Sequence, residues 1–298
     1  MLFNGKMMKG KAGMKLIISE DHEGATVRHM ALKVARISES SFRSMKFSGG
    51  ILLDGNVARA NERVKCGQVL SFRFHDAPVL PVQKNHGDNV VFVYEDEDLE
   101  VIAKPAPLPT MASAKQAGDT LESRYVAQTG RMFRPVNRLD KGTSGLMAAA
   151  KSSHAQQLMQ KKLHTDEFVR EYVAICDGSP AETEGVIDLP IGKESGVKRC
   201  IAADGKNART HYQVLKKGRS RTLLHLRLET GRTHQIRVHL AAMGCPVTGD
   251  YLYGREHDLL PGRFALHSCA IRFTQPVTGQ KIDLKLDMPK EWGMLLNE

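Results

Sequence analysis

The sequence predicts an α+β protein in two parts: a small N-terminal α+β domain, and a larger domain built on a mixed, mainly antiparallel sheet. Two features indicate this class. Short apolar runs typical of strands recur along the chain, and only a few stretches have helical spacing. Charge also divides the chain, because residues 1–75 hold 13 basic and 6 acidic side chains, residues 76–127 hold 4 and 9, and residues 128–298 hold 26 and 18. The acidic stretch therefore separates two basic parts.

The first basic part begins with a predicted flexible basic N-terminus, residues 1–14, followed by a small domain over residues 15–76. Two helices and then two strands are expected in this domain, at residues 26–35, 39–46, 50–53 and 69–74. Asp54-Gly55-Asn56 supplies a hairpin turn after the first strand, since these residue types accept the backbone angles of tight turns.

A polar, proline-bearing linker is predicted over residues 77–89, and the larger domain over residues 90–298. In this domain alternating or continuous apolar runs predict strands, and longer periodic segments predict helices. The expected strands are residues 90–94, 100–103, 168–176, 223–228, 264–273 and 281–286, and the expected helices are residues 120–128 and 154–164. The first two strands are expected to pair across the acidic turn, and the last two to form a hairpin.

Composition excludes several classes of protein. With 41% apolar and 26% charged residues, the chain can bury a core, and no apolar run approaches the roughly 18 residues of a membrane span. The apolar segment near the N-terminus is too short for a secretory signal. The five cysteines form no C-x-x-C pair, so neither a disulfide framework nor a zinc knuckle is expected. A cytoplasmic protein with no membrane contact fits these observations, and the net charge of +10 indicates an anionic partner.

The densest group of chemically useful residues is the segment 137–146, which reads N-R-L-D-K-G-T-S-G-L. Asp140 lies between Arg138 and Lys141 and precedes a Gly-rich turn. Turn residues of this kind often indicate only backbone geometry. A functional interpretation requires an ionised Asp140 held by a partner cation, so that it can act as a nucleophile or base.

A second segment, residues 231–240, reads G-R-T-H-Q-I-R-V-H-L and can supply that cation. It predicts a short helix with Thr233 as N-cap and Gly244 as its stop. Basic side chains gather at the predicted N-terminus, where the helix dipole favours anions, so Arg232 or Arg237 could hold a phosphate or a buried carboxylate. His234 and His239 are five residues apart rather than the four of a helical zinc pair, and no metal site is expected. Nucleotide-binding glycine motifs and a serine elbow are likewise absent from the sequence.

Together these segments resemble the RluA-type family of pseudouridine synthases, which isomerise uridine within RNA. The family motif H-R-L-D-x-x-T-S-G is matched by residues 137–145 with Asn137 in place of His, and G-R-T-H-Q-I-R-V-H is matched by residues 231–239 without a change. The similarity extends over about residues 90–290 through weaker stretches at 103–109, 170–174, 188–192, 208–212 and 265–268. Residues 37–55 resemble the small alpha-L RNA-binding module, and Arg43 and Lys46 on its second helix are its candidate RNA contacts.

The resemblance implies roles for the matching residues. Asp140 would be the catalytic aspartate, attacking the nucleoside or removing a proton from its sugar. Tyr172 would stack on the base and handle the proton at carbon 5, and Arg237 would pair with Asp140. Arg138 would reach into the RNA beside the flipped uridine, and Arg232 would contact RNA. Because all these groups are side chains, neither a metal nor an organic cofactor is expected.

Other interpretations remain open from the sequence. Tyr172 could be only a core residue, Arg237 a surface helix residue, and Lys104 either a strand-end residue or a second phosphate contact. The whole chain could be a catalytically inactive RNA-binding or ribosome-assembly protein on the same scaffold. A hydrolase lacks a second carboxylate at identifiable spacing. The preferred hypothesis is a monomeric RNA pseudouridine synthase, with ribosomal RNA favoured over transfer RNA because of the N-terminal module.

Overall fold

The chain forms two compact units, and the computed structural model describes residues 7–10, 13–73, 89–112, 118–163 and 165–297. The first unit comprises residues 1–78 and 152–157, and the second comprises residues 79–151 and 158–298. Residues 1–6 and 11–12 of the predicted N-terminus, and residues 77–88 of the predicted linker, lie outside the described part. None of the described helices has the length and apolar character needed to cross a bilayer.

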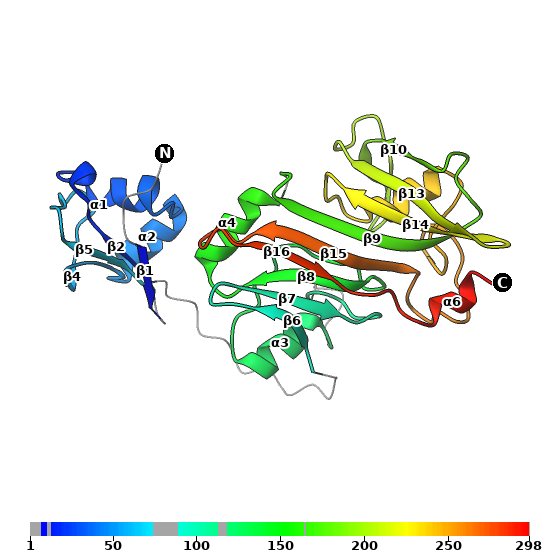
Figure 1. Ribbon diagram of the computed structural model, residues 1–298, viewed down its shortest axis with the longest axis horizontal. Coiled ribbons are helices and arrows are strands. Elements are labelled where there is room, and N and C mark those ends of the chain that lie inside the picture. The colour runs from blue at the N-terminus through cyan, green and yellow to red at the C-terminus, as the bar shows by residue number, and fades with distance from the viewer. Residues whose placement is uncertain (1–6, 11–12, 74–88, 113–117, 164, 298) are drawn as a thin grey trace. The chain divides into compact units, whose positions relative to one another are not determined.

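The N-terminal unit contains a five-stranded antiparallel sheet in the order β1-β2-β5-β3-β4 (Figure 1). Its elements are β1 (Met7–Gly10), β2 (Gly13–Ile17), η1 (Glu20–His22), α1 (Val27–His29), η2 (Met30–Val34), α2 (Glu39–Phe47), β3 (Ile51–Leu53), β4 (Asn56–Val57) and β5 (Val69–Phe72). The first predicted helix is divided between α1 and the π-helical turn η2. Within residues 1–14, predicted as a flexible N-terminus, the structure places β1 and the start of β2, which pair as an antiparallel hairpin. Met30, Phe42 and Leu70 share one buried core.

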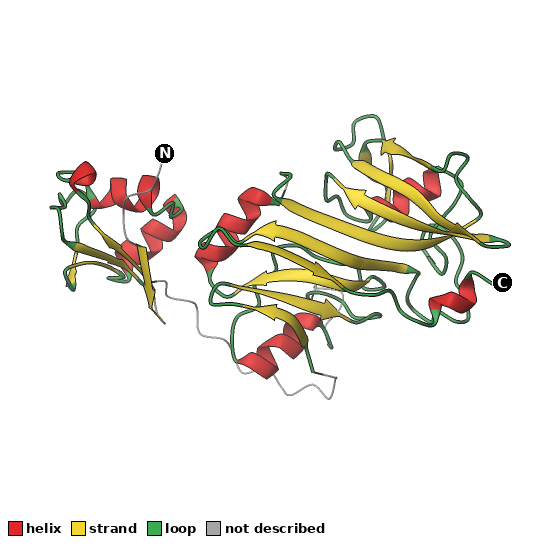
Figure 2. Ribbon diagram, viewed as in Figure 1, coloured by secondary structure: helices red, strands yellow, loops and turns green. Residues whose placement is uncertain are grey.

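The second unit is a nine-stranded mixed sheet in the order β10-β13-β14-β9-β15-β8-β7-β6, with β16 paired to β15 (Figures 1 and 2). From residue 91 the elements are β6 (Val91–Glu95), β7 (Leu99–Lys104), α3 (Leu121–Thr129), β8 (Ser144–Ala150), α4 (Ser153–Lys162), β9 (Phe168–Asp177), β10 (Glu184–Asp188), β11 (Ile191–Lys193), β12 (Arg199–Ile201), β13 (Arg209–Lys217), β14 (Arg221–Leu228), α5 (Gln235–Ala242), β15 (Leu266–Thr274), β16 (Lys281–Lys285) and α6 (Trp292–Leu295). Among the described strands only β8 and β15 pair in parallel, and the predicted α+β, mainly antiparallel class is confirmed.

Alternation along β9 shows how both faces of the sheet are covered. Tyr172 and Ala174 pack in one core with Leu121 of α3 and Ile236 of α5. Val173 and Ile175, which alternate with these two residues along the strand, point to the opposite face. There they pack with Trp292 of α6. Neighbouring residues of a strand face opposite sides of a sheet, so one strand contributes to both cores. The face that carries Tyr172 is the one that also carries the two sequence motifs.

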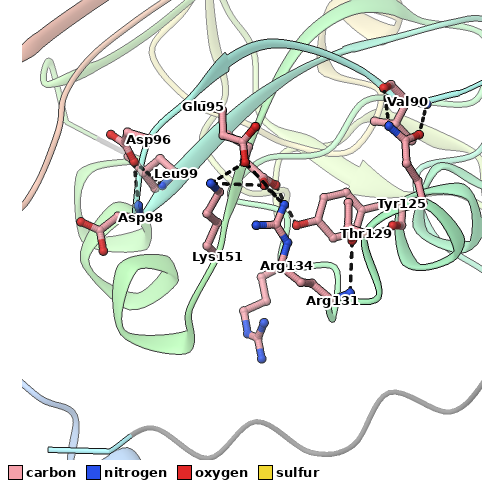
Figure 3. Close-up of polar contacts among 12 residues, drawn as sticks. Val90, Glu95, Asp96, Asp98, Leu99, Tyr125, Thr129, Arg131, Arg134 and Lys151 are labelled. Atoms are coloured by element: carbon pink, nitrogen blue, oxygen red, sulfur yellow. Dashed lines mark hydrogen bonds and ion pairs between the residues drawn. The ribbon is translucent and has the colours of Figure 1, made fainter. Parts of the chain in front are cut away.

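A polar cluster around the buried carboxylate of Glu100 fastens α3 to the edge of the sheet (Figure 3). The hydroxyl of Tyr125 donates to Oε2 of Glu100 at 2.7 Å, and Arg131 pairs with Oε1 of the same carboxylate. Nζ of Lys151 lies 2.6 Å from Oε1 of Glu95, which also faces Arg131 at 3.8 Å. Burial raises the pKa of Glu100, and the hydrogen bond from Tyr125 and the two cations oppose the rise. The cluster therefore fixes the chain that leads from α3 to the first motif.

Candidate active site

The loop that carries Asp140 precedes β8 and is held by the segment after β7. Thr110 Oγ1 donates to the Leu139 carbonyl at 2.6 Å, and the Leu108 N–H donates to the Lys141 carbonyl at 2.9 Å. Nζ of Lys104, only 2% exposed, donates to the carbonyls of Leu108, Pro105 and Lys141. Burial lowers the pKa of Lys104 to about 7. Lys104 is thus a buried support of the Asp140 loop, and its interpretation as a phosphate contact is wrong.

Two glycines of the first motif are required by close packing. A Cβ on Gly142 would lie 2.5 Å from the ring of Phe264. Gly145 has φ of 109°, and a Cβ there would lie 2.3 Å from the Ser268 carbonyl oxygen of β15. Glycine is the residue that adopts positive φ without steric cost, so this position follows from the parallel pairing of β8 with β15. The Gly-rich turn brings the Asp140 loop against Phe264 and β15.

The second motif forms α5, but the helix begins one residue later than predicted. His234 is the N-cap, in the left-handed region with φ of 57°, and the predicted cap Thr233 lies before it. The side chain of Gln235 holds this turn instead, because its Oε1 accepts from the Thr230 hydroxyl at 2.8 Å and from the Arg232 N–H at 2.9 Å. Arg232 and His234 therefore lie in the loop before the helix rather than on it.

Arg237 joins the two motifs. Its Nη1 donates to Oδ2 of Asp140 at 3.0 Å, while its Nε and Nη2 donate to the two oxygens of Asp250 at 2.7 and 2.8 Å. The guanidinium lies 4.2 Å from the centre of the Phe264 ring and 5.0 Å from that of Tyr253. Burial opposes its charge, but the hydrogen bonds and charges of both aspartates outweigh burial and raise the pKa of Arg237. Arg237 is 2% exposed, so its interpretation as a surface residue is wrong.

His234 lies close to the same carboxylate oxygen of Asp140. Its Nε2 lies 3.8 Å from Oδ2 of Asp140, and its Nδ1 lies 2.9 Å from the Tyr253 hydroxyl. That hydroxyl accepts the Arg199 N–H at 2.9 Å and can donate its own proton to Nδ1. This assignment satisfies every group and places the imidazole proton on Nε2, toward the carboxylate. Burial lowers the pKa of His234, which favours the neutral ring, although Asp140 opposes the shift.

Tyr172 lies in β9 on the same side as Asp140. It is buried in the main core and also lines the cavity that the two motifs enclose, so both sequence interpretations describe part of its environment. Burial raises the pKa of Tyr172, Arg170 opposes the rise, and Asp140 adds to it. A neutral hydroxyl is therefore the stable form at neutral pH, as a proton donor in this position requires.

The cavity has a volume of about 550 Å³ and is strongly cationic. Its described lining contains one carboxylate, Asp140, and five cations: Arg138, Lys141, Arg170, Arg232 and Arg237. Arg138 is exposed, and the side chain of Asp140 is 27% exposed, so both are accessible to a ligand. Such an arrangement suits a polyanion with one group presented to the aspartate.

The structure also places the remaining residues considered in the sequence. Asn137 is buried, and its Oδ1 accepts the Ala148 N–H of β8 at 2.9 Å, so its side chain supports the fold. Arg43 and Lys46 are exposed on α2 of the N-terminal unit. In the described part of the chain no three His, Cys, Asp or Glu side chains are grouped so that they could hold a metal.

Sequence reasoning assigned no role beside Asp140 to four residues that surround it: Arg170, His234, Tyr253 and Asp250. Arg170 is two residues from both Phe168 and Tyr172 along β9, so it lies on the same face of the strand as these aromatic residues. That position indicates a side chain that points into the protein. His234 lies within the second motif, next to Gln235. Asp250 and Tyr253 follow α5 in a segment with no periodic pattern, and nothing in the sequence links them to Arg237.

Comparisons with known proteins agree with this geometry. Residues 98–242 match the family model described as RNA pseudouridylate synthase. The chain is 31% identical to an uncharacterized RNA pseudouridine synthase of Bacillus subtilis, over 83% of this chain and 85% of that one. It is 36% identical to ribosomal large subunit pseudouridine synthase D of Nitrosomonas europaea, over 78% and 70%. Among solved structures, human RNA pseudouridylate synthase domain containing 1 is similar with a TM-score of 0.57 and 26% identity, over 69% of this chain and 87% of that one.

Proposed function

Since the chain belongs to the RluA-type family of pseudouridine synthases, and is therefore an isomerase that modifies RNA, we propose that Asp140 is its catalytic aspartate and that its substrate is ribosomal RNA. The observation that carries the proposal is the bridge from Asp140 through Arg237 to Asp250. This bridge holds a partly exposed carboxylate in a cationic cavity beside Tyr172.

The roles follow from where each side chain lies. Whether Asp140 attacks the nucleoside or removes a sugar proton, the step begins at its carboxylate, which Arg237 orients. Tyr172 provides an aromatic surface for the uracil and a neutral hydroxyl for proton transfer at carbon 5. Arg138 is exposed at the cavity, where it can occupy the space left by the extruded uridine, and Arg232 contacts the RNA backbone. One chain supplies the whole set, so we expect a monomer to be active.

Two observations support ribosomal RNA as the substrate. The N-terminal unit presents Arg43 and Lys46 on an exposed helix, as an RNA-docking module requires. A relative of 36% identity is described as acting on the large ribosomal subunit. The competing function, an inactive RNA-binding or assembly protein, leaves the Asp140, Tyr172 and Arg237 arrangement without a purpose.

The test is release of tritium from RNA that carries uridine tritiated at carbon 5. Wild type should release tritium from large-subunit ribosomal RNA, Asp140→Asn should release none, and Asp188→Asn, a control at an exposed ion pair, should match wild type. RNA affinity should persist in Asp140→Asn. No release by wild type from ribosomal or transfer RNA would refute catalysis, and release from transfer RNA alone would refute the substrate.

A further inference from the structure

Arg170 is a buried guanidinium in the cavity wall, and among the residues that the structure describes no carboxylate pairs with it. It projects from β9 and is 4% exposed. In the described part of the chain its Nη2 donates to the Leu163 carbonyl at 3.3 Å, and its Nε is buried with no partner. The face of the Phe168 ring, 5.8 Å away, supplies packing but no negative charge.

This environment differs from that of the other buried arginine of the cavity. Arg237 has two carboxylates and uses three of its nitrogens, whereas Arg170 has one long hydrogen bond to a neutral carbonyl. Burying a cation without a counter-ion is strongly unfavourable. Burial accordingly lowers the pKa of Arg170, and only the nearby Tyr172 opposes the shift. A buried donor left without a partner requires an explanation, and a ligand that completes the site would provide one.

The backbone of Gly231 packs closely against the guanidinium of Arg170 at the cavity wall. A Cβ on Gly231 would lie 2.7 Å from Nη1 of Arg170. A side chain at this position would clash with the guanidinium, so glycine allows Arg170 to keep its place at the wall of the cavity that both residues line. The loop that begins there also carries Arg232, so two guanidiniums lie on this side of the cavity.

We propose that Arg170 binds a phosphodiester group of the RNA chain beside the target uridine. The inference rests on the proposed function and adds a backbone contact to it. Arg170 and Tyr172 lie on one face of β9, about 7 Å apart, since each residue of a strand adds about 3.4 Å. When uracil lies on Tyr172, a guanidinium one pleat away faces the sugar-phosphate chain. Uracil is neutral, whereas a phosphodiester is always charged and accepts both arms of a guanidinium.

The first test is the salt dependence of binding to a large-subunit ribosomal RNA transcript, with Arg170→Gln, Arg170→Lys and wild type. Losing one phosphate contact should weaken binding of Arg170→Gln about tenfold and make the slope of log affinity against log salt shallower by about 0.7 to 0.9. Arg170→Lys keeps the charge and should keep the slope. Lys216→Gln removes an exposed charge outside the cavity and should match wild type. An unchanged slope in Arg170→Gln refutes the phosphate contact.

The second test uses single methylphosphonate linkages, which carry no charge, on either side of the modified uridine in the shortest fragment that releases tritium. One linkage should weaken wild-type binding about tenfold and leave Arg170→Gln binding unchanged. If the same linkage weakens both proteins equally, another residue makes the contact and the proposal is wrong.

Two further outcomes keep the proposal separate from folding and from the proposed function. If neither linkage affects wild type, the proposal is wrong, and this result does not depend on whether the variant folds. Tritium release by wild type tests the proposed function independently, so an active enzyme with no sensitivity to either linkage refutes only the role of Arg170.

Discussion

Asp250→Asn tests whether a buried ion pair holds Arg237 in place. Asp250 has no exposed surface and accepts two charge-assisted hydrogen bonds from Arg237, at 2.7 and 2.8 Å. Its Oδ1 also accepts the Leu252 N–H at 3.0 Å. The amide keeps the shape of the carboxylate but removes its charge and one acceptor oxygen. Arg237 should therefore lose its fixed orientation toward Asp140.

The magnitude follows from these contacts. Hydrogen bonds to charged groups contribute about 1.5–3 kcal/mol each, and breaking a buried pair costs about 3–5 kcal/mol. Asparagine can keep one of the two bonds to Arg237, and Asp140 still offsets the cation. We expect the free energy of unfolding to fall by about 2–4 kcal/mol.

The assay is urea unfolding followed by tryptophan fluorescence. Trp292 is the single tryptophan of the chain and is buried in the second unit, so the signal reports that unit alone. The matched control is Asp188→Asn, which removes a carboxylate from an exposed pair with Arg209 and should leave the midpoint unchanged. A loss below about 1 kcal/mol for Asp250→Asn, or equal effects of the two variants, would show that the buried pair does not hold Arg237.

Two other substitutions test the supports of the Asp140 loop. Burial lowers the pKa of Lys104 to about 7, below its value in the unfolded chain. Above pH 7 the native protein therefore binds fewer protons than the unfolded chain does, and its free energy of unfolding rises with pH. From pH 7 to 9 the free energy of unfolding should rise about 2 kcal/mol more in wild type than in Lys104→Met, and parallel pH profiles would contradict this cause. Gly142→Ala places a methyl group against Phe264, which stacks on Arg237, and should cost about 1–3 kcal/mol while slowing tritium release. Gly293→Ala, where the new methyl group meets no atom within 4 Å, is its control, and equal stability of the two variants would refute the packing argument.

Local patterns predicted part of the fold, but β10 to β13 were not among the expected strands. Alternation predicted β9 and β14, and turn residues predicted the terminal hairpin of β15 and β16. These signals lie within a few residues of one another, so they can be read without knowledge of the fold. The resemblance to a known family then supplied the pairing of Arg237 with Asp140, two residues 97 positions apart.

The remaining parts of the site depend on contacts that no local pattern encodes. Thr233 is a good N-cap by residue type, but the side chain of Gln235 fixes the turn and His234 becomes the cap. Lys104 resembles an accessible cation in the sequence, yet three carbonyls from two segments enclose it. Asp250 acquires its role only when the segment after α5 folds back onto Arg237.

The position of β15 between β8 and β9 affects when an active enzyme can exist. The strand that follows Asp140 and the strand that carries Tyr172 do not pair with each other, because β15 lies between them and bonds to both. Phe264, which stacks on Arg237, directly precedes this strand. During synthesis from the N-terminus, every residue proposed for the chemistry leaves the ribosome before the strand that brings them together. A nascent chain that ends before β15 should therefore hold the reactive groups but not the assembled site, so activity should begin only after residues 266–274 have been synthesised.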